Sequence, residues 1–148
     1  MKLGNTTKAL TIVAIFAIAL TTACAANASE KGCSNATLRG PYSDQDTGTI
    51  VGLGPFAGVN VDRFDGHGNM TISGISSVNG SVSQGEETGT YQVNPDCTGT
   101  YTVKDSYGDT FDAFFVISDE GNDLRIVITD PDTVITCIAR KQSPEHLD

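Results

Sequence analysis

Cys33, Cys97 and Cys137 are the residues whose types and spacing point most clearly to a chemistry. No two cysteines of the chain stand in C-x-x-C spacing, so the pattern favours disulfide formation over a zinc site. Cys33 precedes the first predicted strand, and Cys97 ends a turn where a cross-link would not disturb a hydrogen-bonded ladder. We therefore predict a Cys33–Cys97 disulfide, with Cys137 as a small buried thiol. The alternative, Cys33–Cys137, stays open because the first and last strands of a closed barrel are neighbours.

The loop Asp65-Gly-His-Gly-Asn69 brings a carboxylate, an imidazole and an amide together. It lacks the further ligands of a calcium loop, and one imidazole is too few for a typical zinc site. A glycine-rich turn between two strands accounts for every residue in it. A serine nucleophile would need a base, but the two histidines of the chain are His67 in this turn and His146 in a polar tail. We predict no catalytic residue, no metal site and no cofactor.

Two carboxylate pairs, Asp44/Asp46 and Glu86/Glu87, have the residue types needed for acid–base chemistry on a sugar. Both pairs fall in segments predicted as loops, with no marked partner, so we expect solvated surface. The formal net charge of the chain is −9. This sign repels nucleic acids and anionic membrane surfaces, which are therefore not predicted as partners. It suits solubility outside the cell or, alternatively, the docking of cations or basic partners.

Residues 1–28 have the order of a secretory signal peptide. Two lysines form a basic head, an unbroken apolar run covers 9–20, and Ala26-Asn27-Ala28 ends the segment with small residues. The run is shorter than the about 20 apolar residues that a membrane-spanning helix needs. We predict export with cleavage after Ala28, no membrane span, and a secreted or periplasmic location.

Cys24 offers a second interpretation of the same segment. The cysteine of a lipoprotein signal is preceded, three positions earlier, by an aliphatic residue, and that position holds Thr21. A lipid anchor at Cys24 is therefore the alternative to a simple cut after Ala28. The remaining chain is predicted as one domain, residues 29–141, followed by a polar C-terminal tail, residues 142–148.

Short segments rich in Val, Ile, Thr, Tyr and Phe alternate with glycine-containing turns in this domain, a composition that favours strands over helices. Turn signals recur about every ten residues. They include Asn79-Gly80, a strong hairpin signal, and Asp130-Pro131-Asp132. The predicted strands are Ala36–Ser43, Thr47–Leu53, Phe56–Phe64, Asn69–Val78, Gly89–Val93, Gly99–Asp105, Thr110–Ser118, Leu124–Thr129 and Thr133–Arg140.

The alternation of apolar and polar residues indicates how these strands associate. Leu124, Ile126 and Ile128 share one face of their strand, and Phe111 and Phe115 share one face of the strand before it. One apolar face per strand suits a closed sheet with a single interior. Consecutive short hairpins favour neighbouring strands pairing in order. We predict an all-β, single antiparallel up-and-down barrel of about eight strands.

Several segments, taken in order, resemble a family of small exported bacterial proteins. The most specific are Cys33-Ser-Asn-Ala-Thr-Leu-Arg-Gly-Pro-Tyr42 and Asn94-Pro-Asp-Cys-Thr-Gly99; the glycine turn after Phe64 and the segment Thr129–Val134 add to them. The resemblance covers nearly all of the predicted domain. It implies secretion and an antiparallel, calycin-like barrel similar to those of lipocalins and allene-oxide-cyclase-like proteins. It implies no catalytic residues.

Aromatic and aliphatic side chains on the predicted inner faces could line a cavity for a small apolar or aromatic ligand, or pack as an ordinary core. The candidates are Tyr101, Phe111, Phe115, Leu124 and Ile126. We predict an exported, non-enzymatic module that binds a small ligand or assembles with a protein partner. The alternative is a cyclase-like or isomerase-like enzyme that uses the barrel cavity. A roomy cavity with a buried polar group of perturbed pKa would favour the enzyme, whereas a packed interior would leave only assembly.

Overall fold

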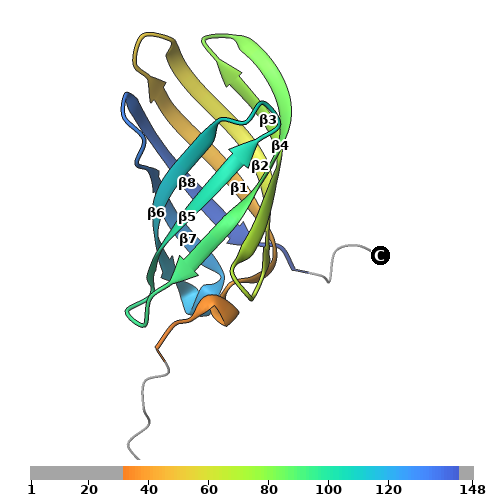
Figure 1. Ribbon diagram of the computed structural model, residues 1–148, viewed down its shortest axis with the longest axis vertical. Coiled ribbons are helices and arrows are strands. Elements are labelled where there is room, and N and C mark those ends of the chain that lie inside the picture. The colour runs from red at the N-terminus through yellow and green to blue at the C-terminus, as the bar shows by residue number, and fades with distance from the viewer. Residues whose placement is uncertain (1–31, 144–148) are drawn as a thin grey trace, which may run out of the picture.

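The structure, a computed structural model, describes residues 32–143. Eight antiparallel strands, each paired with the next and the last paired with the first, form a closed barrel (Figure 1). The predicted all-β, up-and-down barrel is therefore confirmed. The signal peptide predicted over residues 1–28 lies outside the described residues. The strands are β1 (Arg39–Ile50), β2 (Gly54–Asp65), β3 (Asn69–Val78), β4 (Ser81–Val93), β5 (Thr98–Asp105), β6 (Thr110–Ser118), β7 (Asp123–Ile128) and β8 (Thr133–Lys141).

Two strands differ from the sequence prediction. β1 is continuous across Asp44–Asp46, where two separate strands were predicted. β4 begins at Ser81, eight residues before the predicted start at Gly89. Residues 81–88 carry few residues with strand preference, but they pair along their length with β3, so backbone hydrogen bonding in the closed sheet outweighs local composition.

The two ends of the barrel are built differently (Figure 1). The β2–β3, β4–β5 and β6–β7 turns lie at one end, together with two short 3-10 helices, η1 (Asn35–Thr37) and η2 (Asp119–Gly121). We call the barrel interior next to these elements the closed half. The four hairpin turns that join β1–β2, β3–β4, β5–β6 and β7–β8 lie at the other end, and the interior there is the open half.

The closed half is packed with large apolar side chains. Tyr42, Phe64 and Tyr91 stack edge to face, with ring centroids 5.2 Å apart for the first pair and 5.0 Å for the second. Leu38, which follows η1, and Phe115 of β6 are completely buried in the same core. This packing leaves the closed half without room for a ligand and fixes the positions of the strands that continue into the open half.

The polar atoms of this core are satisfied by the segment that covers it. The Tyr91 hydroxyl donates to the carbonyls of Asn35 and Leu38, each at 3.0 Å. The Asn35 side chain accepts from the Val93 amide at 2.8 Å. The Tyr42 hydroxyl donates to the Gly121 carbonyl on η2. Residues 33–38 thereby cap the end of the barrel through directional bonds as well as apolar contact.

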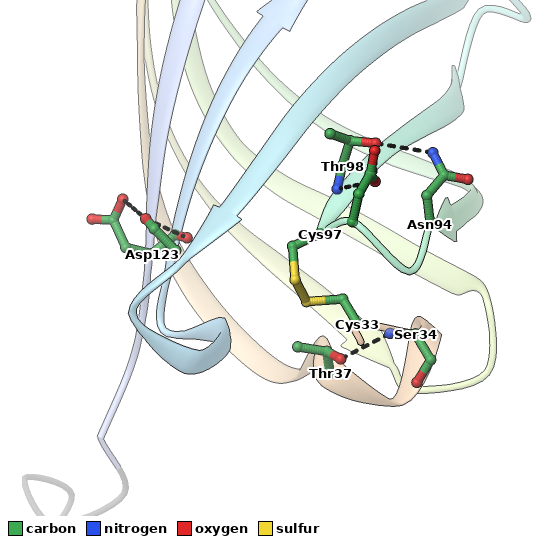
Figure 2. Close-up of a disulfide and its surroundings, with 9 residues drawn as sticks. Cys33, Ser34, Thr37, Asn94, Cys97, Thr98 and Asp123 are labelled. Atoms are coloured by element: carbon green, nitrogen blue, oxygen red, sulfur yellow. Dashed lines mark hydrogen bonds between the residues drawn. A yellow bond between two sulfur atoms is a disulfide. The ribbon is translucent and has the colours of Figure 1, made fainter. Parts of the chain in front are cut away.

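A disulfide between Cys33 and Cys97 holds this cap in place, as Figure 2 shows. It joins the segment before η1 to the β4–β5 turn, and the Cys33 amide also donates to the Pro95 carbonyl at 3.1 Å. The predicted pairing is confirmed, and Cys137 is a buried free thiol on β8. Within residues 32–143, no helix is long and apolar enough to cross a bilayer.

Candidate functional site

The open half of the barrel contains a cavity of about 300 Å³. All eight strands contribute to its walls, β7 only through its last residue, Ile128, and the β5–β6 turn completes them. Small residues on β3 and β4, namely Gly74, Ser76, Ser83 and Gly85, face this space, where bulky side chains would otherwise fill it. The cavity therefore exists because the inward positions of two neighbouring strands are small.

Much of the wall near the mouth is apolar, although Glu86, Asp105 and Ser106 also lie there. Ile50, Phe56 and Val78 lie beside the β1–β2 and β3–β4 turns, and Phe111 and Ile128 lie on the other side of the opening. Tyr107, in the β5–β6 turn, is 92% exposed at the rim. This part of the cavity is suited to an aliphatic or aromatic group.

The deepest polar feature is a group of three buried carboxylates, Asp44, Asp46 and Asp62, which we call the acidic floor. They expose only 7%, 9% and 0% of their surface. Asp44 and Asp46 occupy successive inward positions of β1 and line the cavity. Asp62 lies beside them on β2, opposite Tyr42. The expectation that Asp44 and Asp46 are solvated loop residues is wrong, because β1 continues through them and its pleat turns both side chains inward.

The acidic floor has few hydrogen-bond donors besides its own protonated groups, the Asp44 carboxyl and the Cys137 thiol, which both lie within hydrogen-bonding reach of Asp46. The Asn60 side-chain amide donates to Asp46 Oδ2 at 2.6 Å. Asp44 Oδ1, Asp46 Oδ1 and both carboxylate oxygens of Asp62 are buried and have no hydrogen-bond partner among residues 32–143. Buried acceptors are normally paired, so this group is an exception that a functional role would explain.

Burial is the main cause of the altered acidity at the floor. It raises the pKa of Asp44 to about 9, with a further increase from the charge of Asp62. It raises the pKa of Asp62 to about 8, helped by the charges of Asp46 and Glu87. Glu87, inward on β4 and paired in register with Asp105 of β5, also has a raised pKa from burial and from that neighbour. Because their pKa values are raised, Asp44 and Asp62 hold protons near neutral pH unless a positive charge approaches them.

Two glycines leave space for the polar side chains of Asp46 and Asn60 at the acidic floor. A Cβ at Gly58 would lie 2.9 Å from Asp46 Oδ2, and a Cβ at Gly74 would lie 2.2 Å from Asn60 Oδ1. Any larger residue at these positions would displace the side chains that form the polar floor. Gly85 is different, because a Cβ there would meet nothing within 4 Å.

A metal ion fits this site poorly. Asp44, Asp46 and Cys137 each offer one ligand atom, and these atoms lie within 4.8 Å of one another. Metals bind the thiolate form of cysteine, but burial raises the pKa of Cys137 and keeps its thiol protonated. The two carboxylates that remain are fewer than the six to eight oxygen ligands that Ca²⁺ usually takes. The arrangement is better suited to an organic group.

The predicted cavity residues are divided between the two halves. Tyr101 and Phe111 line the cavity. Phe115, Leu124 and Ile126 are buried in the core and are not among its lining residues. Tyr101 contacts both regions, since its ring stacks on Phe115 with centroids 6.3 Å apart. Sequence reasoning missed the acidic floor, although the sequence contains a signal for it. Tyr42, Asp44 and Asp46 alternate with Ser43, Gln45 and Thr47, so a strand that buries Tyr42 also turns both aspartates inward.

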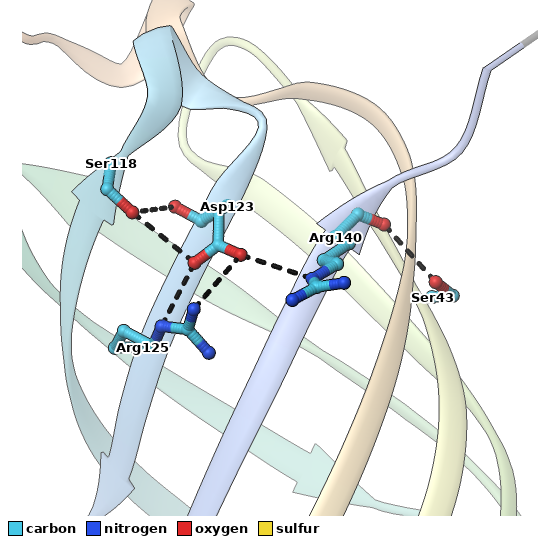
Figure 3. A network of polar contacts seen from close by, with 5 residues as sticks. All are labelled: Ser43, Ser118, Asp123, Arg125 and Arg140. Carbon is cyan, nitrogen blue, oxygen red and sulfur yellow. Dashed lines mark hydrogen bonds and ion pairs between the residues drawn. The ribbon is translucent and has the colours of Figure 1, made fainter.

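The remaining sequence candidates have structural roles. The Asp65 carboxylate accepts bonds from the His67 amide at 2.6 Å and the Asn69 amide at 3.0 Å, so this loop is the predicted turn. The expectation that Glu86 and Glu87 lie in a solvated loop is wrong: both are part of β4, where Glu86 is exposed at the cavity rim and Glu87 is half-buried and faces the cavity. On the outer surface, Asp123 pairs with Arg125 at 3.1 Å and with Arg140 at 3.3 Å (Figure 3). The Arg125 pair lies within β7, and the Arg140 pair joins β7 to β8. Because both arginines are exposed, the two ion pairs add little stability.

No family model, curated protein or solved structure matches this chain. Its function is therefore inferred from the cavity and the residues that line it.

Proposed function

We propose that this protein is an exported barrel that binds one small molecule in its open half. The observation that carries the proposal is the cavity of about 300 Å³, open at one end of a barrel whose other end is packed and cross-linked. A volume of this size lies at the lower end of the range of small-molecule sites. The disulfide agrees with a protein that works in an oxidising compartment.

The walls define the kind of molecule. Phe56, Phe111 and Ile128 offer apolar surface near the mouth, so the bound molecule has an aliphatic or aromatic body. The closed half contributes by holding the strands rigidly, so that the cavity exists before the ligand arrives and binding requires little ordering of the protein.

The test uses a neutral fluorescent probe, N-phenyl-1-naphthylamine, and a variant that fills the cavity. Gly85→Phe places a ring in open space, and the residue has no backbone requirement for glycine. We expect this variant to keep its thermal stability and to lose probe binding by at least about ten-fold. Thr88→Phe, on the outer face of the same strand, is the matched control and should bind the probe normally. Equal binding by both variants, or no binding by the unaltered chain, would contradict the proposal.

A second candidate function is acid-catalysed isomerisation or cyclisation. The specific observation in its favour is Asp44, a cavity-lining carboxyl whose pKa of about 9 would let it donate a proton near neutral pH. Native mass spectrometry of the protein purified from its host would identify a retained molecule. Incubation of that molecule with the protein in D₂O should then introduce carbon-bound deuterium, and Asp44→Asn should abolish the exchange. Recovery of the molecule without deuterium would remove the enzyme and leave the binding module.

A further inference from the structure

We propose that the molecule bound in the open half is a cation, with a protonated amine that pairs with Asp44 and Asp46 and an apolar body that lies against the wall near the mouth. This inference rests on the proposed binding function and specifies the ligand's charge. It makes the barrel a carrier or scavenger of amphiphilic amines.

The charges that line the cavity all have one sign. Asp44, Asp46, Glu87 and Asp105 face the cavity, and Glu86 lies at its rim. None of its lining residues, all within the described part of the chain, is lysine, arginine or histidine. A carboxylate or phosphate ligand would find no cationic partner here, and a neutral ligand would supply no positive charge to the acids.

The unpartnered oxygens of the floor are the second observation. Asp44 and Asp46 are more than nine-tenths buried, line the cavity, and each has an Oδ1 atom without a hydrogen-bond partner among residues 32–143. An ammonium group has three N–H donors, no acceptor and a positive charge. It therefore supplies what these oxygens lack, through charge-assisted hydrogen bonds.

The acidity of the floor agrees with this assignment. Burial and the neighbouring acids keep Asp44 and Asp62 protonated in the protein on its own. A cation at the floor offsets both effects, because it stabilises the ionised carboxylates and screens their mutual repulsion. Gly58 and Gly74 leave the Asp46 and Asn60 side chains free to orient toward such a group.

The position of the apolar residues sets the shape of the cation. Phe56, Phe111 and Ile128 lie toward the hairpin turns, whereas Asp44 and Asp46 lie farther along the barrel toward the closed half. A ligand that contacts both regions carries its charge at one end. A hydrated metal ion or a small ammonium ion would leave the apolar wall uncovered.

The experiment compares three probes with one indole body and different end groups: tryptamine (cationic), tryptophol (neutral) and indole-3-propionate (anionic). The chain contains no tryptophan, so indole fluorescence anisotropy reports binding without a protein background. We expect tryptamine to bind at least about ten-fold more tightly than tryptophol, and indole-3-propionate to bind most weakly.

Asp44→Asn should weaken tryptamine binding by about ten-fold and change tryptophol binding by less than about two-fold. Retained tryptophol binding also shows that this variant is folded with its cavity intact. Asp46→Asn should weaken tryptamine in the same direction. Asp119→Asn, an exposed change on η2 at the opposite end of the barrel, removes the same charge and controls for general attraction of cations to an acidic protein.

The outcomes separate this inference from the proposed function. Equal affinities for tryptamine and tryptophol would overturn the cation assignment while leaving the binding cavity in place. Binding of none of the three probes, together with no binding of the neutral naphthyl probe, would overturn both. A third set of results would make the floor a metal site and overturn the inference. In it, ZnCl₂ or CaCl₂ displaces tryptamine, Asp44→Asn loses metal binding, and tryptamine binds no more tightly than tryptophol.

Discussion

The closed and open halves of the barrel share the same strands but use their inward positions in opposite ways. In the closed half, Tyr42, Phe64 and Tyr91 fill the interior, and the tyrosine hydroxyls are hydrogen-bonded to backbone carbonyls. In the open half, Asp44 and Asp46 occupy successive inward positions of β1, and the Oδ1 atom of each has no hydrogen-bond partner among the described residues. The difference shows that apolar packing and buried unpaired acids are placed in separate halves of a continuous sheet, so that the well-packed half can offset the cost of the acids.

The largest effect should follow removal of the disulfide that fixes the closed half. The bond links residues 64 apart in sequence, and its loss, in a Cys33→Ser/Cys97→Ser variant, should lower the free energy of unfolding by about 4 kcal/mol. Urea unfolding followed by circular dichroism measures this change. Cys137→Ala, at the cavity, is the comparison and should have a much smaller effect. Equal stability with and without reductant would show that the cap holds without its cross-link.

A matched pair on β6 compares the halves directly. Phe115 is completely buried in the closed half, whereas Phe111 is only partly buried and lines the cavity. Phe115→Ala should lower the free energy of unfolding by about 3 kcal/mol, and Phe111→Ala by about 1 kcal/mol. The order should reverse for ligand affinity, because only Phe111 faces the bound molecule. Similar stability losses for both variants would mean that the two halves are packed alike.

The pH dependence of stability tests the acidic floor. The pKa values of Asp44 and Asp62, about 9 and about 8, are raised above those of an unfolded chain, so the folded protein binds more protons between about pH 4 and pH 9. Stability should therefore fall as pH rises through this window, by about 2 kcal/mol or more between pH 5 and pH 9.

Asp62→Asn should flatten this dependence and stabilise the protein at pH 8, because the amide does not ionise. Thermal unfolding across the pH series measures both effects. Asp65 does not obscure the result: hydrogen bonds from Asn69 and His67 lower its pKa to about 2, so its contribution is lost only under more acidic conditions. A stability that rises from pH 5 to pH 9 would contradict the assignment of a buried, unpaired acid.

The smallest effect concerns single hydroxyl groups. The Tyr91 hydroxyl donates to two carbonyls of the cap, whereas Tyr107 is 92% exposed at the cavity rim. Tyr91→Phe should lower the free energy of unfolding by about 1 kcal/mol. Tyr107→Phe should leave it unchanged within about 0.5 kcal/mol. Native-state hydrogen exchange of the Val93 amide would show whether the Tyr91 change loosens the cap locally.

The closed half was the more predictable part of the molecule. In this half the strands alternate apolar inward and polar outward residues, with Leu124 and Ile126 inward on β7. The position of Cys33 before the first strand favoured the observed disulfide. These features follow from burial of one face of each strand, which sequence periodicity records directly.

The open half was harder to predict because it reverses the usual pattern. On β2, Val59 points outward and is 61% exposed, while Asn60 and Asp62 point inward. A rule that places valine inside and aspartate outside therefore assigns this part of the strand to the wrong face. The same rule led to the prediction of two separate strands on either side of Asp44–Asp46, where β1 is in fact continuous. Only the closure of the barrel, a long-range property, fixes which face these residues share.

The disulfide also affects how the barrel would respond to mechanical force. β1 and β8 are antiparallel neighbours, and both the start of β1 and the end of β8 lie at the capped end. Tension between these two points would open the β1–β8 seam one hydrogen bond at a time, starting near Tyr42 and Lys141. Cys33 lies before β1, so a pull on the chain ahead of it passes through the covalent bond to Cys97 on the far side of the barrel. In the oxidised protein part of such a load would pass to the β4–β5 turn, whereas with reduced cysteines all of it would reach the β1–β8 seam.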